Sequence, residues 1–194
     1  MVAFLVYPAL LFWVQQKTNP LSIIKNGVIA HQKNSSLQEA LLNNVYGIAP
    51  GKLGSDLLSE SIQNLTESYP HITQIPNEKV LKIAGESTEF TITTNKTSYT
   101  SKIIVLGIGV ANTFDIEVLM QYVEPNQKTL PEKKRIQLKN TDYKVAEGIY
   151  VIGTLAGLRS QVAIAAGSGA AVATDILTLW NDRIQTQVHD SIKK

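Results

Sequence analysis

The sequence predicts one α/β domain of three layers, in which a buried parallel sheet is joined to a β-meander. With 194 residues, 44% of them hydrophobic, the chain can bury one sizeable core but is short for two ordinary domains. We expect a single domain over residues 1–180 and a polar helical tail over 181–194. The prediction rests on three patterns. They are mainly apolar runs at 2–6, 21–24, 103–106 and 149–152, alternating runs between residues 79 and 100, and an alanine- and glycine-rich segment at 161–180.

The amino-terminal segment is expected to form a strand, a helix and a second strand. Residues 2–6 are a continuous apolar run, Pro8 suits the first turn of a helix over 8–17, and the run 21–24 follows. This order is typical of a βαβ unit with parallel strands. The apolar stretch 2–14 is shorter than the roughly 20 residues of a transmembrane helix, and it lacks the basic start and cleavage site of a signal peptide. We expect no membrane span and a cytoplasmic protein.

The middle of the chain indicates a helix followed by antiparallel strands. After a loop at 47–54, Ser55-Asp56 offers an N-cap for a helix that ends near Tyr69-Pro70. Short runs that alternate apolar and polar residues then predict a β-meander at 79–84, 90–94 and 99–100. The contiguous apolar residues 103–106 predict a buried strand over 102–106, which Gly107-Ile108-Gly109 closes.

The segment 112–145 is polar and is predicted to be a crossover that ends in an edge hairpin. It carries only modest strand runs, at 117–123 and 135–138. A last buried strand at 149–152 and a loop at 153–160 then lead into the helix 161–180. Because alanine and glycine dominate the first half of this helix, its backbone can lie very close to a sheet or a ligand.

Composition excludes several classes of function. A formal net charge of +2, with the charged residues scattered along the chain, gives no concentrated field for nucleic acid. The absence of cysteine excludes disulfides, thiolate metal sites and redox-active cysteine pairs. The three histidines lie far apart, so we expect no metal site. No nucleophile or general base stands out, and we expect no catalytic side chain.

Two stretches resemble the carboxy-terminal flavin motif of thioredoxin-reductase-like FAD-dependent pyridine nucleotide-disulfide oxidoreductases. They are GIYVIGTLAG at 148–157 and QVAIAAGSG at 161–169, and the likeness extends to 46–68 and 79–109. The resemblance implies a three-layer FAD/NAD(P)-binding Rossmann-like domain with FAD as its cofactor. In that family an NAD(P)-binding domain, which carries the redox cysteines of the true thioredoxin reductases, is inserted after about Gly109. Only about forty residues bridge that interval in this chain.

The resemblance also implies where FAD would lie, and there the family's pattern is degenerate. In the glycine-rich turn Pro8 and Ala9 match the family, but Leu5, Tyr7 and Leu10 replace glycines and obstruct the phosphates. Lys25 and Asn26 replace the acidic residue that ends the second strand and accepts the ribose hydroxyls.

The flavin end of this site is retained better. Gly153 is kept, whereas Thr154 replaces an aspartate that accepts a ribityl hydroxyl, and the helix start Gln161-Val162 faces the flavin's pyrimidine edge through its N–H groups. The candidate cofactor-binding residues are therefore Tyr7, Pro8, Ala9, Asn26, Gly109, Gly153, Thr154, Gln161 and Val162.

Two classes of function stay open, and neither names a substrate. The first is a minimal FAD-dependent oxidoreductase that exchanges electrons with a redox partner or with diffusible NAD(P)H. The second is a flavin-free scaffold that binds a partner protein or a small ligand. We expect a protein partner or a homodimer in either case. A third hypothesis is anchoring to a membrane surface through the large apolar residues Phe4, Leu11, Phe12 and Trp13. A buried strand and helix explain these residues more simply.

Overall fold

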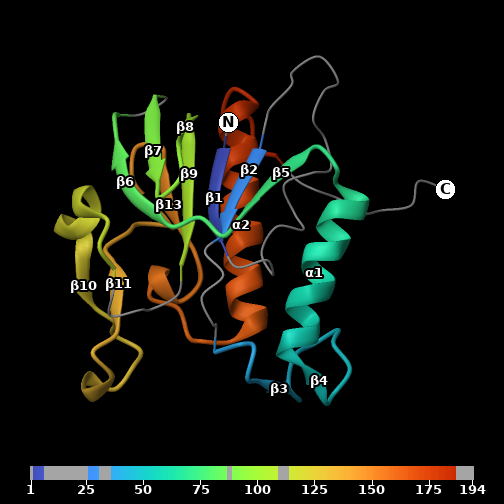
Figure 1. Ribbon diagram of the computed structural model, residues 1–194. Coiled ribbons are helices and arrows are strands. Elements are labelled where there is room, and N and C mark those ends of the chain that lie inside the picture. Colours follow the sequence, from blue (N-terminus) through green and yellow to red (C-terminus); the bar gives the residue numbers. More distant parts are fainter. Residues whose placement is uncertain (1, 7–25, 31–35, 87–88, 109–113, 187–194) are drawn as a thin grey trace.

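The computed structural model describes residues 2–6, 26–30, 36–86, 89–108 and 114–186 (Figure 1). Its centre is a six-stranded sheet in the order β12-β13-β9-β1-β2-β5. All neighbouring strands in it are parallel except β12, which pairs with β13 in the antiparallel sense. The strands are β1 (Val2–Val6), β2 (Asn26–Ala30), β5 (Ile72–Pro76), β9 (Ile103–Gly107), β12 (Lys144–Ala146) and β13 (Ile149–Val151).

The two faces of this sheet are covered by different kinds of structure, as the sequence predicts. One face carries the helices α1 (Gly54–Ser68) and α2 (Val162–Trp180). The other carries an antiparallel meander of β6 (Val80–Ala84), β7 (Phe90–Thr94) and β8 (Ser98–Ser101), which stands beside the sheet in Figure 1. The three-layer α/β fold with a parallel sheet and a β-meander is therefore confirmed.

Strand β9 has buried residues on both faces and so divides the core into two clusters. Ile103 and Val105 pack on the helix side with residues of α1 and α2, whereas Ile104 and Leu106 pack on the meander side with Phe90 and its neighbours. Successive side chains of a strand point to opposite faces. One contiguous apolar run therefore supplies both cores.

The crossover between β9 and β13 differs in part from the prediction. Residues Glu117–Tyr122 form a 3₁₀ helix, so the strand predicted at 117–123 is wrong except at its end. Ile116, Leu119 and Tyr122 all pack against the meander-side core, and a spacing of three residues matches the three-residue turn of a 3₁₀ helix. The chain continues as β10 (Val123–Pro125), which pairs with β11 (Ile136–Leu138) in a separate two-stranded sheet. The hairpin at the edge of the central sheet is formed instead by β12 and β13, and β12 was not predicted.

Apart from β12, three short strands were not expected from the sequence. The two-residue strands β3 (Leu41–Leu42) and β4 (Lys52–Leu53) pair with each other before α1. The third is β5, which ends in Pro76 and forms an edge of the sheet. Proline is tolerated on an edge strand because its missing N–H faces away from the ladder.

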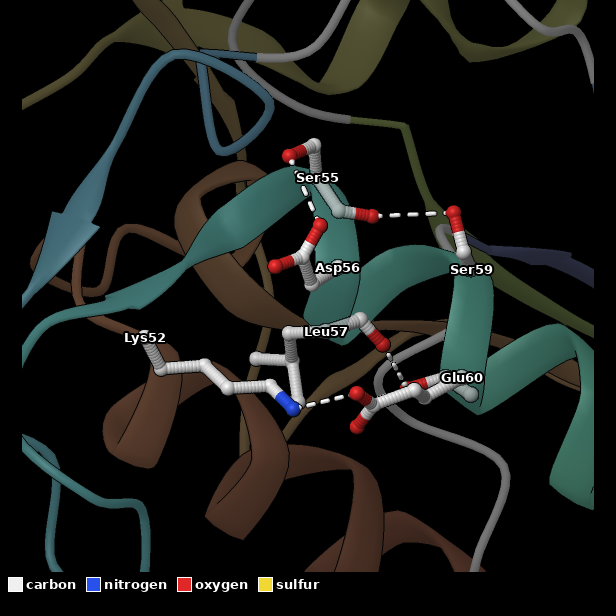
Figure 2. Close-up of polar contacts among 7 residues, drawn as sticks. Lys52, Ser55, Asp56, Leu57, Ser59 and Glu60 are labelled. Carbon is white, nitrogen blue, oxygen red and sulfur yellow. Dashed lines mark hydrogen bonds and ion pairs between the residues drawn. The ribbon is translucent and has the colours of Figure 1, made fainter.

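The start of α1 also differs from the prediction (Figure 2). The N-cap is Leu53, with no side-chain capping bond, so Ser55-Asp56 does not cap the helix. Instead Ser59 Oγ donates to the Ser55 carbonyl at 3.0 Å, and Lys52 forms an ion pair with Glu60 across the first turns.

Two predicted helices cannot be compared in full with the structure. The helix at 8–17, like the strand at 21–24, lies outside the described residues, and the second strand found is β2. Helix α2 ends at Trp180 and residues 181–183 form a turn, so the helical tail does not begin at 181. Asp182 and Arg183 have φ values of 51° and 64°, which a right-handed helix excludes.

Among the helices of the described residues, α2 alone has the length and apolar composition of a membrane-spanning helix. Its residues Val172, Ala173 and Ile176 lie in the helix-side core. Packing against the sheet therefore accounts for these apolar positions.

Substitution of Gly148 tests how tightly the edge hairpin is packed against the meander. Its φ is +73°, and a Cβ there would lie 2.8 Å from Phe90 Cε2, whereas a Cβ at Gly47, with φ +82°, would meet nothing within 4 Å. We expect Gly47→Ala to lower the free energy of unfolding by about 1 kcal/mol through its backbone alone. Gly148→Ala should cost about 3 kcal/mol, because overpacking is added. Urea unfolding followed by circular dichroism measures both, and equal losses would contradict this packing.

Candidate functional site

The parallel strands end together at one edge of the sheet, and the predicted flavin-end residues lie there. Val6 of β1 is opposite Gly107 of β9, and the Ile152 N–H after β13 donates to the Leu106 carbonyl at 2.9 Å. The chain then forms the 3₁₀ helix η4 (Gly153–Ala156) and enters α2. Ligands of open α/β sheets bind beyond the carboxyl ends of the strands. Gly153, Thr154, Gln161 and Val162 are therefore positioned at the expected edge.

The other predicted site residues are not brought to this edge. Tyr7, Pro8, Ala9 and Gly109 lie outside the described residues. Asn26 is the first residue of β2 and pairs with Val2 and Ile72 at the amino ends of their strands, so its predicted place at the end of the second strand is wrong. The error arose because β2 begins at residue 26, five positions later than the predicted strand at 21–24. β2 ends at Ala30, and the sequence has no acidic residue from 26 to 38.

A buried serine fixes the loop after β13 to the last helix. The Gly153 N–H donates to Ser168 Oγ at 2.9 Å, and that hydroxyl donates to the Ala165 carbonyl at 2.7 Å. Ser168 is buried. The Gly153 N–H therefore has its acceptor within the protein. Sequence reasoning missed Ser168, although it is the one hydroxyl residue in the alanine- and glycine-rich run 161–173.

The amino terminus of α2 leaves hydrogen-bond donors open at the same edge. Gln161 is the N-cap and makes no side-chain capping bond. Its own N–H donates to the Arg159 carbonyl, but the N–H groups of Val162, Ala163 and Ile164 have no acceptor among the described residues. Such a terminus carries partial positive charge and suits an oxygen or nitrogen acceptor with negative charge.

The β10–β11 hairpin braces this loop from the side. The buried Asn126 donates through Nδ2 to the Thr154 carbonyl at 3.2 Å. Gly157 has φ +79°, and a Cβ there would lie 2.7 Å from Gln137 Oε1 of β11. The half-buried Thr154 keeps a hydroxyl with no hydrogen-bond partner in the part of the chain that the structure describes. Asn126 and Gln137 were not predicted, because their contacts join residues distant in sequence.

Another buried polar group, in the meander, is fully engaged. The Glu78 carboxylate accepts bonds from Thr94 Oγ1 at 2.6 Å and from the Tyr99 hydroxyl at 3.1 Å. Burial, and secondarily the Glu78 carboxylate, raise the pKa of Tyr99. This carboxylate braces the meander and is not at the strand edge.

The chemistry available at the strand edge is that of neutral hydrogen-bond donors. Among the described residues no three histidine, cysteine, aspartate or glutamate side chains converge to hold a metal ion. The edge offers backbone N–H groups, the Thr154 hydroxyl and the partial charge of a helix. Redox chemistry at such a site would have to be supplied by a bound cofactor.

The Ser168 link can be tested by removing one oxygen. We expect Ser168→Ala to lower the free energy of unfolding by about 2 kcal/mol, because the Gly153 N–H loses its acceptor in a buried place. It should also speed hydrogen exchange at the Gly153 amide. Ser59→Ala is the matched control, since Ser59 makes the same kind of bond to a helix carbonyl at an exposed position, and it should cost less than about 0.5 kcal/mol. Equal effects of the two substitutions would argue against the link.

Comparison with known proteins identifies the fold. No family model matches the sequence, and no curated protein matches it significantly. An oxidoreductase from Agrobacterium tumefaciens superposes with a TM-score of 0.73 at 12% identity, covering 93% of this chain and 98% of that chain. A thioredoxin reductase from Streptococcus pyogenes gives a TM-score of 0.66 at 10% identity over the same shares of the two chains.

A ferredoxin-flavin thioredoxin reductase from Clostridium acetobutylicum gives a TM-score of 0.64 at 15% identity, again covering 93% of this chain and 98% of that one. Identities this low carry information about the fold only. The structural matches agree with the flavin-motif resemblance in the sequence and with the three layers described above. The chain therefore has the thioredoxin-reductase-like fold of the FAD/NAD(P)-binding Rossmann type.

Proposed function

We propose that this chain is a flavin-binding member of the oxidoreductase-like group that shares its fold, and that it holds the flavin ring more firmly than the adenosine. The open amino terminus of α2 beside the Gly153–Thr154 loop is the observation that carries the proposal. A bound flavin would supply two-electron and one-electron chemistry that the side chains of this edge lack.

The donors at this edge suit the flavin's pyrimidine ring. The N–H groups of Val162 and Ala163 point out of the helix without acceptors, while a flavin offers ring carbonyl oxygens and nitrogens that accept hydrogen bonds. Partial positive charge at the helix terminus stabilises negative charge on the ring. The Thr154 hydroxyl is placed on the same loop and can accept one bond from the ribityl chain.

The residues expected at the adenosine end of FAD support cofactor binding less well. Leu5, Tyr7 and Leu10 occupy the positions of the family's glycines, and no acidic residue follows β2 to accept the ribose hydroxyls. Thr154 offers a neutral acceptor, and neutral hydrogen bonds are roughly half as strong as charge-assisted ones. We therefore propose weakened binding of FAD by a cytoplasmic protein, with electrons exchanged through a partner or a diffusible nicotinamide.

A flavin-free scaffold is the second candidate function, and one observation favours it. The loop at Gly153 is held by Ser168 from within and by Asn126 from the side, so it keeps its shape with no ligand. In that case the edge serves to bind a partner protein or a smaller ligand.

Flavin titration separates the two candidates. Purified protein is mixed with FAD, FMN or riboflavin, desalted, and examined for flavin absorbance and for quenching of flavin fluorescence. We expect all three flavins to bind with dissociation constants within about tenfold of each other, because the adenosine contributes little. A protein that retains none of them would favour the scaffold, and strong selectivity for FAD would contradict the weakened adenosine site.

Val162→Pro tests the helix terminus directly. Val162 is the first helical residue, where proline is tolerated, and Gln161 has φ −138° and ψ 143°, which suit a residue before proline. The substitution removes one N–H donor and keeps the helix, so we expect flavin affinity to fall about fivefold at an unchanged melting temperature. Val162→Ala keeps the N–H and should bind like the parent protein. An unchanged affinity in Val162→Pro would place the flavin elsewhere.

Restoring the missing charge tests the ribityl contact. Thr154→Asp recreates the family's Gly-Asp pair, and a carboxylate accepts a hydroxyl bond more strongly than a threonine. We expect flavin affinity to rise about fivefold, whereas the neutral Thr154→Asn should leave it within about twofold. Fluorescence quenching gives both values, and a rise in both variants would show that charge is not the cause.

A further inference from the structure

We propose that a depression beside the edge strand β12 binds a small organic cation, a primary alkylamine. The depression has a volume of about 490 Å³ and lies between β12, β13 and the later turns of α2. It is separate from the strand edge described above. Its lining residues are Thr141, Asp142, Lys144, Val145, Ala146, Glu147, Tyr150 and Asp175.

A buried tyrosine whose hydroxyl has no hydrogen-bond partner among the described residues is the first observation behind this proposal. Tyr150 of β13 is only 7% exposed and packs in the helix-side core, yet it also lines the depression. Its hydroxyl makes no hydrogen bond to any described residue, although buried hydroxyls usually have a partner. Burial is the main cause that raises the pKa of Tyr150, and Lys144, Glu147 and Asp175 act on the same group, so these charges surround it.

The charges around the depression leave an excess of carboxylate. Lys144 forms an ion pair with Glu147 along the edge hairpin. Asp142 and Asp175 make no ion pair with a described residue. Burial and then the Asp142 carboxylate raise the pKa of Asp175, so the two carboxylates repel each other. A cation placed between them removes this repulsion.

The turn that carries Asp142 is rigid. The Thr141 N–H donates to the Lys144 carbonyl at 3.0 Å and the Lys144 N–H donates back at 2.9 Å, which closes a two-residue hairpin turn. Asp142 and Tyr143 have φ values of 47° and 67°, and the Tyr143 side chain packs against the helix-side core. The backbone of Asp142 is therefore fixed beside the depression, and its side chain lines it.

The shape and lining favour an organic cation over a metal ion. No three acidic or histidine side chains converge in the described residues, as a metal site would require. Val145 and Ala146 give the depression an apolar wall, and its volume falls within the range of small-molecule sites. An ammonium group has three donors, which match two carboxylates and the tyrosine oxygen.

Titration of the flavin-free protein with 1,4-diaminobutane tests the proposal independently of flavin binding. Amide chemical shifts recorded by NMR should change at residues 141–150 and around Asp175, and 1,4-butanediol, the uncharged match, should change none of them. Equal responses to the diol would overturn the proposal. So would Mg²⁺ that binds at these residues more tightly than the diamine.

Two substitutions locate the contact. Tyr150→Phe removes only the hydroxyl and should weaken diamine binding about fivefold. Asp175→Asn removes one carboxylate charge and should weaken it about tenfold. Asp182→Asn, at an exposed turn outside the depression, is the control and should bind like the parent protein. Melting temperatures confirm that each variant is folded. Parent-like binding by both Tyr150→Phe and Asp175→Asn would overturn the proposal.

Discussion

The architecture depends on burial of β9 on both of its faces. All five residues of this strand are buried, with Ile103 and Val105 against the helices and Ile104 and Leu106 against the meander. Apolar burial of about 25 cal/mol per Å² on two sides makes such a strand the main source of cohesion in a three-layer domain. The parallel pairing of β9 with β1 and β13 then fixes which strand ends meet at the candidate edge.

The strand edge is built mainly from backbone, and its shape depends on a few polar side chains. Ser168 reaches from α2 to the Gly153 N–H, and Asn126 reaches from the β10–β11 hairpin to the Thr154 carbonyl. These bonds satisfy the groups that face inward. The first-turn N–H groups of α2 stay open because Gln161 does not cap them. The hydrogen-bonded groups of the loop therefore hold its shape, whereas the unbonded N–H groups of α2 can bind a ligand.

Long apolar runs were enough to predict β1, β9 and β13, and alternating and helical patterns predicted the meander, α1 and α2, because burial decides those elements. The sequence could not identify β5, whose residues Ile72–Pro76 alternate weakly, or the 3₁₀ helix at Glu117–Tyr122, whose threefold spacing is short enough to resemble a strand. At the candidate site, Gly153, Thr154, Gln161 and Val162 follow directly from local motif. Ser168 and Asn126 do not, because their hydrogen-bond partners are distant in sequence. Neither does Tyr150, because only the fold places it beside Asp175 in the depression.

The alternation of β13 explains how one strand can serve two sites. Ile149 and Val151 face the meander, Tyr150 faces the helices and lines the depression, and Gly153 follows at the strand edge. Along α2, Val162 and Asp175 are thirteen positions apart, which is about 20 Å at the rise of an α-helix. The helix thus separates the proposed amine site in the depression from the proposed flavin site at the edge. This separation exceeds the distance of about 10 Å over which salt screens exposed charges. A charge bound at one site would therefore have little effect on the other.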